Sequence, residues 1–253
     1  MSAPATAPGA AVHDSGKRRM AMIRNMVLAA GLLLASVPCA AASGVDAASF
    51  DVLGSMMETR RAQINSADIL ESNKEEAIRY REKVIAGWWE FMQARSGARP
   101  GEYCAASFLR GKRVKRERVD GISDGVVVTL FGPGGGYRGA LLGFSPLTQE
   151  HAFPRLGNGT PVRVTLRQGN LQPATLNAIY AQTSATAPPM LLFAVPSIEA
   201  LLAGMEDDWH FEVIYQGASI ADIAWHDGLK ARDALTRCLA GAGDGGRPGT
   251  RRP

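Results

Sequence analysis

Residues 125–145 read GVVVTLFGPGGGYRGALLGFS, which is two apolar segments joined by a short glycine-rich connection. We expect 125–131 and 137–145 to be β-strands, because β-branched and aromatic residues fill them and turn residues bound them. A connection this short has no room for the helix that links parallel strands. The two strands are therefore predicted to be antiparallel.

The same pattern continues on both sides of this pair. Further strands are predicted at 102–109, 161–167, 173–182, 190–195, 210–216 and 219–225, and helices at 198–205 and 227–239. No helical crossover is expected before residue 195. The fold class is therefore predicted to be α+β: a mostly antiparallel β-sheet or sandwich with an N-terminal helical segment and a C-terminal helix.

The N-terminal helical segment is expected at 43–100, ahead of an antiparallel β-rich domain at 101–240. Residues 72–75 (SNKE) match a capping box and predict a helix that ends at 97–100. Trp88 and Trp89 lie in that helix, where neighbouring side chains point about 100° apart. They are expected either to pack against the sheet or to dock a partner.

Residues 1–42 have the pattern of a signal peptide with a possible N-terminal extension. Basic residues at 17–24 precede an apolar run at 26–37, and Ala40-Ala41-Ala42 provides a small-residue cleavage site. The run is shorter than the roughly 20 apolar residues that span a bilayer. Cleavage is expected after Ala42 or, second, after Ala48; lipid attachment at Cys39 and an uncleaved anchor stay as alternatives.

Export would change the composition of the chain. Removing residues 1–42 takes four of the 28 basic residues and one of the 24 acidic residues, so the net charge falls from +4 to +1. Such a chain gives no reason to expect a nucleic-acid partner. Cys104 and Cys238 remain, and two cysteines in an exported chain predict one disulfide. The Gly/Pro-rich tail at 241–253 is expected to be disordered.

A cluster of six basic residues within nine positions is the first candidate site. Its members are Arg110, Lys112, Arg113, Lys115, Arg116 and Arg118. Outside the cytosol such a cluster suits lipid headgroups, lipopolysaccharide phosphates or other polyanions. The alternative is a solvated loop between two strands.

The glycine-rich connection is the second candidate site. Gly134, Gly135 and Gly136 could direct backbone amides at an anion, and Arg138 adds charge. A P-loop is excluded because no Gly-Lys-Ser/Thr opens a helix here. The alternative is a β-hairpin whose glycines supply positive φ.

The sequence contains no motif that meets all the requirements of a catalytic or metal-binding site. Residues 121–125 (GISDG) fit the G-x-S-x-G pattern, but a strand rather than a helix is expected to follow Ser123. Asp208 with His210 or His226 could complete a triad. No histidine lies within five residues of another in the mature chain, so neither a metal site nor a cofactor is expected.

Residues 191–239 (LLFAVPSIEALLAGMEDDWHFEVIYQGASIADIAWHDGLKARDALTRCL) resemble small periplasmic proteins of the invasion-associated locus B type and related exported families. The likeness is the order of a short helix with paired leucines, a hairpin, and a helix opened by Gly228. It implies a β-rich envelope protein and brings no catalytic motif. The long N-terminal helical segment departs from that pattern.

The sequence therefore predicts an exported, periplasmic or secreted, non-catalytic binding or envelope-associated protein. Its contact surface is expected to combine the basic cluster with the 132–139 loop, and its partner to be an anionic envelope component or another envelope protein. One alternative is a secreted hydrolase that uses Ser123 or Cys104. The other is a protein-interaction module that docks through the Trp88/Trp89 helix.

Overall fold

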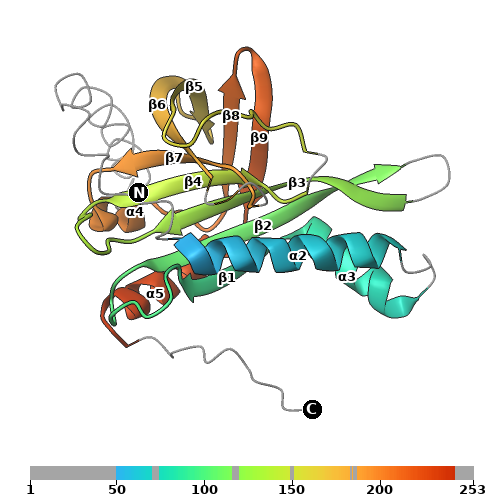
Figure 1. Cartoon of the computed structure of the whole chain (residues 1–253), viewed down its shortest axis with the longest axis horizontal. Coiled ribbons are helices and arrows are strands. Elements are labelled where there is room, and N and C mark those ends of the chain that lie inside the picture. Colours follow the sequence, from blue (N-terminus) through green and yellow to red (C-terminus); the bar gives the residue numbers. More distant parts are fainter. Residues whose placement is uncertain are drawn as a thin grey trace, which may run out of the picture.

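The computed structural model describes residues 50–69, 74–115, 120–148, 151–182, 184 and 187–242 (Figure 1). Its strands are β1 (Trp88–Gln93), β2 (Cys104–Lys115), β3 (Asp120–Phe131), β4 (Ala140–Pro146), β5 (Pro161–Gln168), β6 (Ala174–Ala181), β7 (Met190–Val195), β8 (Trp209–Tyr215) and β9 (Ala218–Trp225). Its helices are α2 (Asp51–Ile69), α3 (Glu75–Ala86), α4 (Ile198–Ala203) and α5 (Gly228–Leu239).

All nine strands belong to one sheet, in the order β1-β2-β3-β4-β7-β6-β5-β8-β9. Every neighbouring pair is antiparallel, which confirms the prediction from the short connections. The architecture is one curled sheet rather than a sandwich, because β9, at one end of the order, also contacts β3 and β4.

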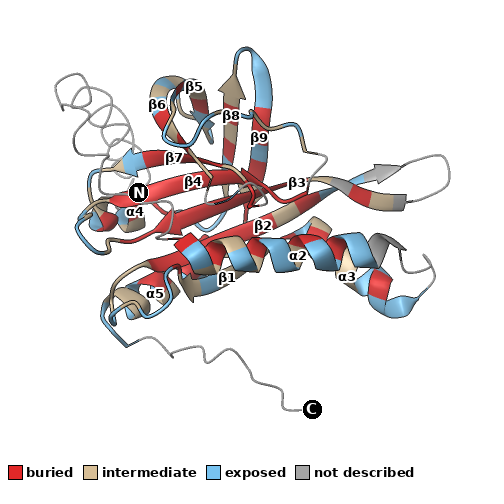
Figure 2. Ribbon diagram, in the orientation of Figure 1, coloured by how far each residue is buried: buried red, intermediate tan, exposed pale blue. Residues whose placement is uncertain are grey.

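The curled sheet has a core on each face. On the inner face, Phe108, Val128 and Phe144 pack with α4 and α5. On the outer face, Val127 and Leu141 pack with α2. Alternate residues of one strand supply the two cores, as the two-residue period of a strand requires. Figure 2 shows the central strands buried along most of their length, and β4 is buried at all seven positions.

Helix α2 covers the outer face because its apolar side chains recur at helical spacing. Leu53, Met57 and Ile64 are each less than 3% exposed, and positions three, four and seven apart share one face of a helix. Phe50, just ahead of the helix, lies with its ring centroid 4.7 Å from that of Phe131 on β3.

The predicted Trp88/Trp89 helix is wrong. Helix α3 ends at Ala86, Gly87 follows with a φ of +88°, and both tryptophans lie on β1. Successive strand residues point to opposite faces of a sheet. Trp89 therefore packs in the inner core and Trp88 in the outer one, an arrangement that a helix packed on one side could not give.

Other boundary differences are smaller. The helical segment expected at 43–100 is interrupted by β1, and α3 has Lys74 at its N-cap without a side-chain hydrogen bond. The predicted capping serine, Ser72, lies outside the described residues, as do the signal peptide and residues 243–253 of the tail. None of the helices in the described part of the chain combines the length and apolar character that a bilayer span requires.

Candidate functional site

The basic cluster lies on the hairpin formed by β2 and β3. Its first four members, 110, 112, 113 and 115, belong to β2, so this part of the cluster is strand rather than loop. Lys112 and Arg113 are exposed, and Arg110 is half-buried. Arg116 and Arg118 lie outside the described residues.

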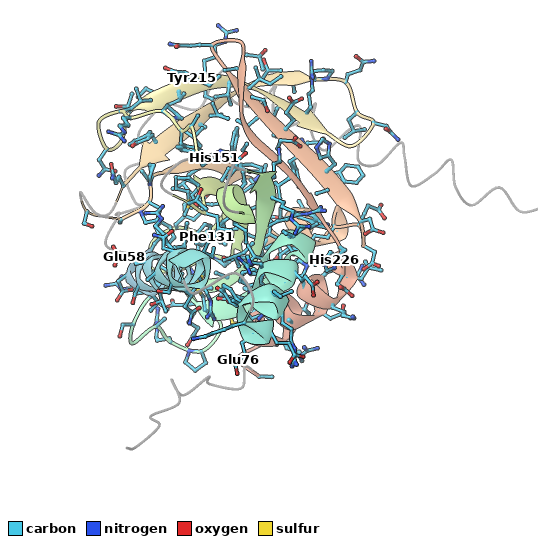
Figure 3. The ribbon with its side chains drawn as sticks, turned by 90° about the vertical axis from the view of Figure 1, so that its right-hand side faces the viewer. Glu58, Glu76, Phe131, His151, Tyr215 and His226 are labelled. Carbon is cyan, nitrogen blue, oxygen red and sulfur yellow. A yellow bond between two sulfur atoms is a disulfide. The ribbon has the colours of Figure 1, made fainter. Side chains whose placement is uncertain are left out.

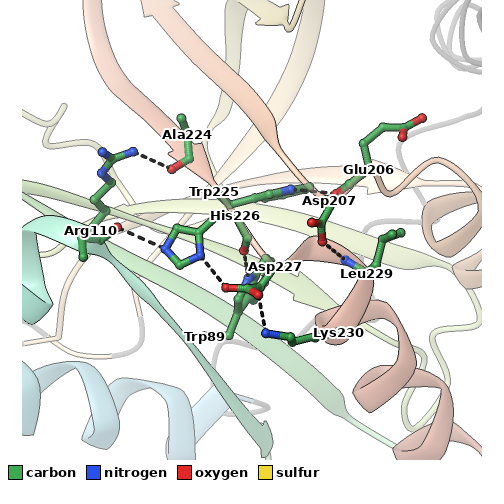
Figure 4. A network of polar contacts seen from close by, with 11 residues as sticks. Trp89, Arg110, Glu206, Asp207, Ala224, Trp225, His226, Asp227, Leu229 and Lys230 are labelled. Atoms are coloured by element: carbon green, nitrogen blue, oxygen red, sulfur yellow. Dashed lines mark hydrogen bonds and ion pairs between the residues drawn. The ribbon is translucent and has the colours of Figure 1, made fainter.

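Arg110 has a structural role in this hairpin (Figure 4). Its Nε donates a hydrogen bond to the carbonyl oxygen of Ile85 on α3, 3.1 Å away. Its Nη1 donates to the carbonyl oxygen of Ala224 on β9, at 3.0 Å. The guanidinium therefore holds a helix and a distant strand against β2, and these donors serve the fold rather than the predicted contact surface.

Lys112 forms an ion pair with Asp222 on β9, with 3.1 Å between Nζ and Oδ2. His210 on β8 lies 2.7 Å from the other oxygen of the same carboxylate. Burial opposes the charged form of Asp222, but the hydrogen bonds from His210 and Lys112 outweigh it and lower the pKa of this carboxyl. All three side chains are about half exposed, so Lys112 stays accessible to an anion.

The glycine-rich connection is a tight turn rather than an open anion cradle. Gly134 and Tyr137 exchange two backbone hydrogen bonds, of 3.0 and 3.1 Å, and enclose Gly135 and Gly136. The ring of Tyr103 covers Gly134 so closely that a Cβ there would lie 2.7 Å from it. At this position a glycine is required for packing, in agreement with the hairpin interpretation.

Arg138 is exposed beside this turn. The pKa of the Glu102 carboxyl is lowered, mainly by its hydrogen bond from Arg99. The positive charge of Arg138 lowers it further. The loop therefore offers one exposed cation.

The structure separates the two predicted sites. The basic cluster lies at the end of β3 that begins with Asp120, and the glycine-rich turn follows the other end, at Phe131. Lys112 and Arg113 pair with Asp124 and Ile122, which lie seven and nine residues before Phe131, so at about 3.3 Å per residue the separation is roughly 23–30 Å. The prediction that both sites form one contact surface would therefore require a partner that spans this distance.

The predicted disulfide is present. Cys104 at the start of β2 and Cys238 in α5 are bonded, with 6.0 Å between their Cα atoms. Cys104 is fully buried and its sulfur is already used in the bridge. The alternative in which Cys104 acts as a nucleophile is therefore wrong for the oxidised protein, because the nucleophile in such chemistry is a thiolate.

Ser123 lies inside β3, so it is not on the strand-to-helix turn of a nucleophile elbow. The nearest histidine in sequence to this stretch, His151, has both ring nitrogens engaged. Nδ1 contacts Asp124 and Nε2 lies 2.7 Å from the carbonyl oxygen of Ile220. Neither nitrogen is left to accept a proton from a serine, as a general base must. Figure 3 shows His151 between Tyr215, near the tip of the β8–β9 hairpin, and Phe131.

The histidines of the proposed triad bond to other groups. His210 bonds Asp222, and His226 lies with Nδ1 2.6 Å from Asp227 and Nε2 3.3 Å from the carbonyl oxygen of Ala86. Neither forms a described hydrogen bond to Asp208. The described residues therefore contain no pairing of Asp208 with either histidine, as a catalytic triad would need.

Around His226 the contacts join β1 to the start of α5 (Figure 4). Trp89 donates from Nε1 to the carbonyl oxygen of His226 at 2.6 Å. The amide of Leu229 in the first turn of α5 donates to a side-chain oxygen of Asp207, at 3.2 Å. Asp227, at the N-cap position of α5, makes no side-chain capping hydrogen bond, and Asp207 accepts one from the first turn of the helix instead.

One feature was missed from the sequence: a groove between α3 and the β2–β3 hairpin, with a volume of about 300 Å³. Ile78 and Ile85 of α3 line it, together with Arg113. The seven-residue spacing of the two isoleucines is the signal that could have indicated a second apolar stripe on this helix.

Within the described residues, no group of three or more histidine, cysteine or acidic side chains could hold a metal ion. No protein-family model, curated protein or solved structure matches the chain. The resemblance of residues 191–239 to periplasmic proteins of the invasion-associated locus B type therefore stays a prediction.

Proposed function

We propose that the chain is an exported, envelope-associated binding protein that contacts an anionic envelope component through the β2–β3 hairpin. The observation that carries this proposal is the exposure of Lys112 and Arg113 on a hairpin that also contains Lys115, Arg116 and Arg118. Figure 1 shows this hairpin reaching beyond the rest of the sheet. Clustered cations on a projecting element meet a charged surface first.

Export is supported by the disulfide between Cys104 and Cys238. Such bridges persist in oxidising compartments and are rare in the cytosol of mesophiles. Both cysteines lie outside the predicted signal peptide, so the processed chain would keep the bridge. The candidate partners are then the anionic lipids and phosphorylated glycolipids of the envelope.

Vesicle binding tests this proposal. The processed, oxidised protein is titrated with vesicles of anionic phosphatidylglycerol and of neutral phosphatidylcholine, at low and at high salt. Each cation near an anionic surface contributes about 1 kcal/mol, so changing Lys112, Arg113 and Lys115 together to glutamine should weaken binding by roughly ten-fold or more. Equal binding to both vesicle types, or no effect of salt, would overturn the electrostatic proposal.

The control variant removes three exposed arginines elsewhere: Arg155 in the segment before β5, Arg163 on β5 and Arg237 on α5. It has the same net charge as the hairpin variant but an intact hairpin. If the site is the hairpin, the control keeps nearly all of the affinity. If the two variants lose affinity equally, binding follows net charge and the hairpin is not the site.

A further inference from the structure

The groove between α3 and the β2–β3 hairpin combines an apolar floor with charged rims. Its apolar residues are Ile78 and Ile85 of α3 and Ile122 of β3. Arg81 and Glu82 of α3 and Arg113 of β2 also line it. Its volume, about 300 Å³, lies at the lower end of the range for small-molecule sites.

Helix α3 has two apolar stripes, and only one of them is used by the core. Ala77 and Val84 are buried against the sheet, whereas Ile78 is 40% exposed and Ile85 is half-buried. A single exposed isoleucine would need no explanation. Here Ile78 lines a groove together with Ile85, which lies seven residues further along the same face of α3. The apolar surface is therefore concentrated in one place.

Helix α3 packs closely against the hairpin beside the groove. Gly111 on β2 has no side chain, and a Cβ there would lie 2.7 Å from Val84 and 2.8 Å from Ile122. Glycine therefore allows the helix to pack directly on the strand. The groove lies beside this contact, and Ile122 belongs to both.

A β-bulge in the hairpin lies beside the groove. Lys112 pairs with Asp124 and Arg113 with Ile122, so Ser123 is an extra residue opposite that step. Bulges increase the local twist and change the direction of neighbouring side chains, often beside binding sites. Arg113 and Ile122 are the pair immediately after this bulge, and both line the groove.

We infer that this groove binds the acyl chain of an anionic amphiphile, with the three isoleucines against the chain and Arg81 and Arg113 facing a phosphate or carboxylate head group. This inference rests on the proposed function and narrows its ligand from an anionic surface to a single-chain anionic lipid. Guanidinium groups suit such heads because they donate paired hydrogen bonds to phosphate and carboxylate oxygens.

Glu82 provides a test with the opposite sign. Its carboxylate is exposed and lines the same groove as the two arginines, so it should repel an anionic head. Glu82→Gln should therefore tighten binding of an anionic amphiphile, while Arg113→Gln weakens it. A purely hydrophobic site would respond to neither change.

The experiment measures binding of dodecyl phosphate to the processed, oxidised protein by calorimetry, below the concentration at which the probe forms micelles. Dodecanoate tests the head group, dodecyl maltoside supplies a neutral head, and inorganic phosphate lacks the chain. Arg113→Gln should weaken dodecyl phosphate binding about three-fold, with Arg163→Gln as the matched control without effect. Each methylene removed from the probe should weaken binding about two- to four-fold. Ile78→Ser should reduce that dependence on chain length.

Equal affinity for dodecyl phosphate and inorganic phosphate, or for dodecyl phosphate and dodecyl maltoside, would overturn the inference. So would unchanged binding in Ile78→Ser and Arg113→Gln. The outcomes separate this inference from the proposed function: anionic vesicles that bind the wild type and the Ile78→Ser variant equally would leave the hairpin as the contact and remove the groove. Loss of vesicle binding on changing only Lys112 and Lys115, with dodecyl phosphate binding intact, would place the two sites apart.

Discussion

Arg110 on β2 donates a hydrogen bond to the backbone carbonyl of Ala224 on β9, with 3.0 Å between the two atoms. In sheet order β2 is the second strand and β9 the ninth, so this bond joins strands near opposite ends of the curled sheet. His151 makes a parallel contact with the carbonyl oxygen of Ile220, two residues before Asp222 on β9. Side chains therefore hydrogen-bond to backbone carbonyl groups of β9, the last strand in the sheet order. Without them this strand would present an open edge.

Replacing Arg110 with methionine should destabilise the protein. Methionine keeps much of the apolar stem but leaves the carbonyl oxygens of Ile85 and Ala224 without their donor. Hydrogen bonds from charged donors are worth about 1.5–3 kcal/mol each. Because Arg110 is only half-buried, water can partly replace both bonds, so we expect the free energy of unfolding to fall by about 2–3 kcal/mol in urea titrations. Arg163→Met, on an exposed position of β5, should change it by less than about 0.5 kcal/mol. Equal effects in the two variants would show that the Arg110 contacts do not stabilise the curl.

Removing the disulfide should also destabilise the fold. Cys104 and Cys238 are 134 residues apart, and closing so long a loop restricts the unfolded chain. The Cys104→Ala/Cys238→Ala variant should lose about 2–5 kcal/mol of unfolding free energy. Thiol titration of the unreduced, denatured wild type provides the check on the bridge itself. Two reactive thiols outside the predicted signal peptide would contradict it.

Two neighbouring glycines allow a matched test of the turn after β3. A Cβ at Gly134 would lie 2.7 Å from the Tyr103 ring, whereas a Cβ at Gly136 would meet nothing within 4 Å. Gly134→Ala should therefore cost about 1–3 kcal/mol of stability through overpacking, and Gly136→Ala should be close to neutral. Thermal unfolding of both variants measures this. A Gly134→Ala protein as stable as the wild type would mean that Tyr103 moves away at little cost.

Asp222 gives the stability a defined dependence on pH. Its hydrogen bonds to His210 and Lys112 outweigh the effect of burial and lower its pKa from the ordinary value of 3.8. A lowered folded-state pKa stabilises the protein above the unfolded-state pKa, and this contribution disappears as the pH falls through the folded-state value. Asp222→Asn should thus be less stable than wild type well above pH 3.8, and the difference should disappear as the pH falls below that value. A difference that stays constant across this range would rule out the ionic contribution.

The β-sheet could be predicted from the sequence because its information is local. Runs such as 125–131 and 190–195 carry strand-forming residues between clear turn signals, and the structure places β3 and β7 there. Short connections then determined that the strands are antiparallel. The pairing of β4 with β7 and of β5 with β8 depends on contacts between distant residues, which no local pattern indicates.

Trp88 and Trp89 show why one segment was predicted wrongly. The apolar spacing of α3 continues into WWEFMQ, so periodicity alone extends the helix. The local signal for its end is Gly87, whose φ of +88° favours glycine. Two adjacent large apolar residues beyond it are better explained by a strand that is covered on both faces.

The candidate site was predicted only in part, and Arg110 explains much of the difference. A cluster of cations indicates a surface, but it cannot show which member is used inside the fold. Arg110 meets Ile85 and Ala224, which lie 25 and 114 residues away in the chain. The groove lined by Ile78 and Arg113 likewise exists only after α3 and the hairpin have packed together.

Intact-mass measurement of the native protein from fractionated cells tests the central claim of an exported, disulfide-bonded chain. We predict that the protein is found outside the cytoplasm, begins at Ser43, and gains two hydrogen atoms in mass on reduction. An unprocessed chain in the cytoplasm with Cys104 and Cys238 both reduced would contradict the claim.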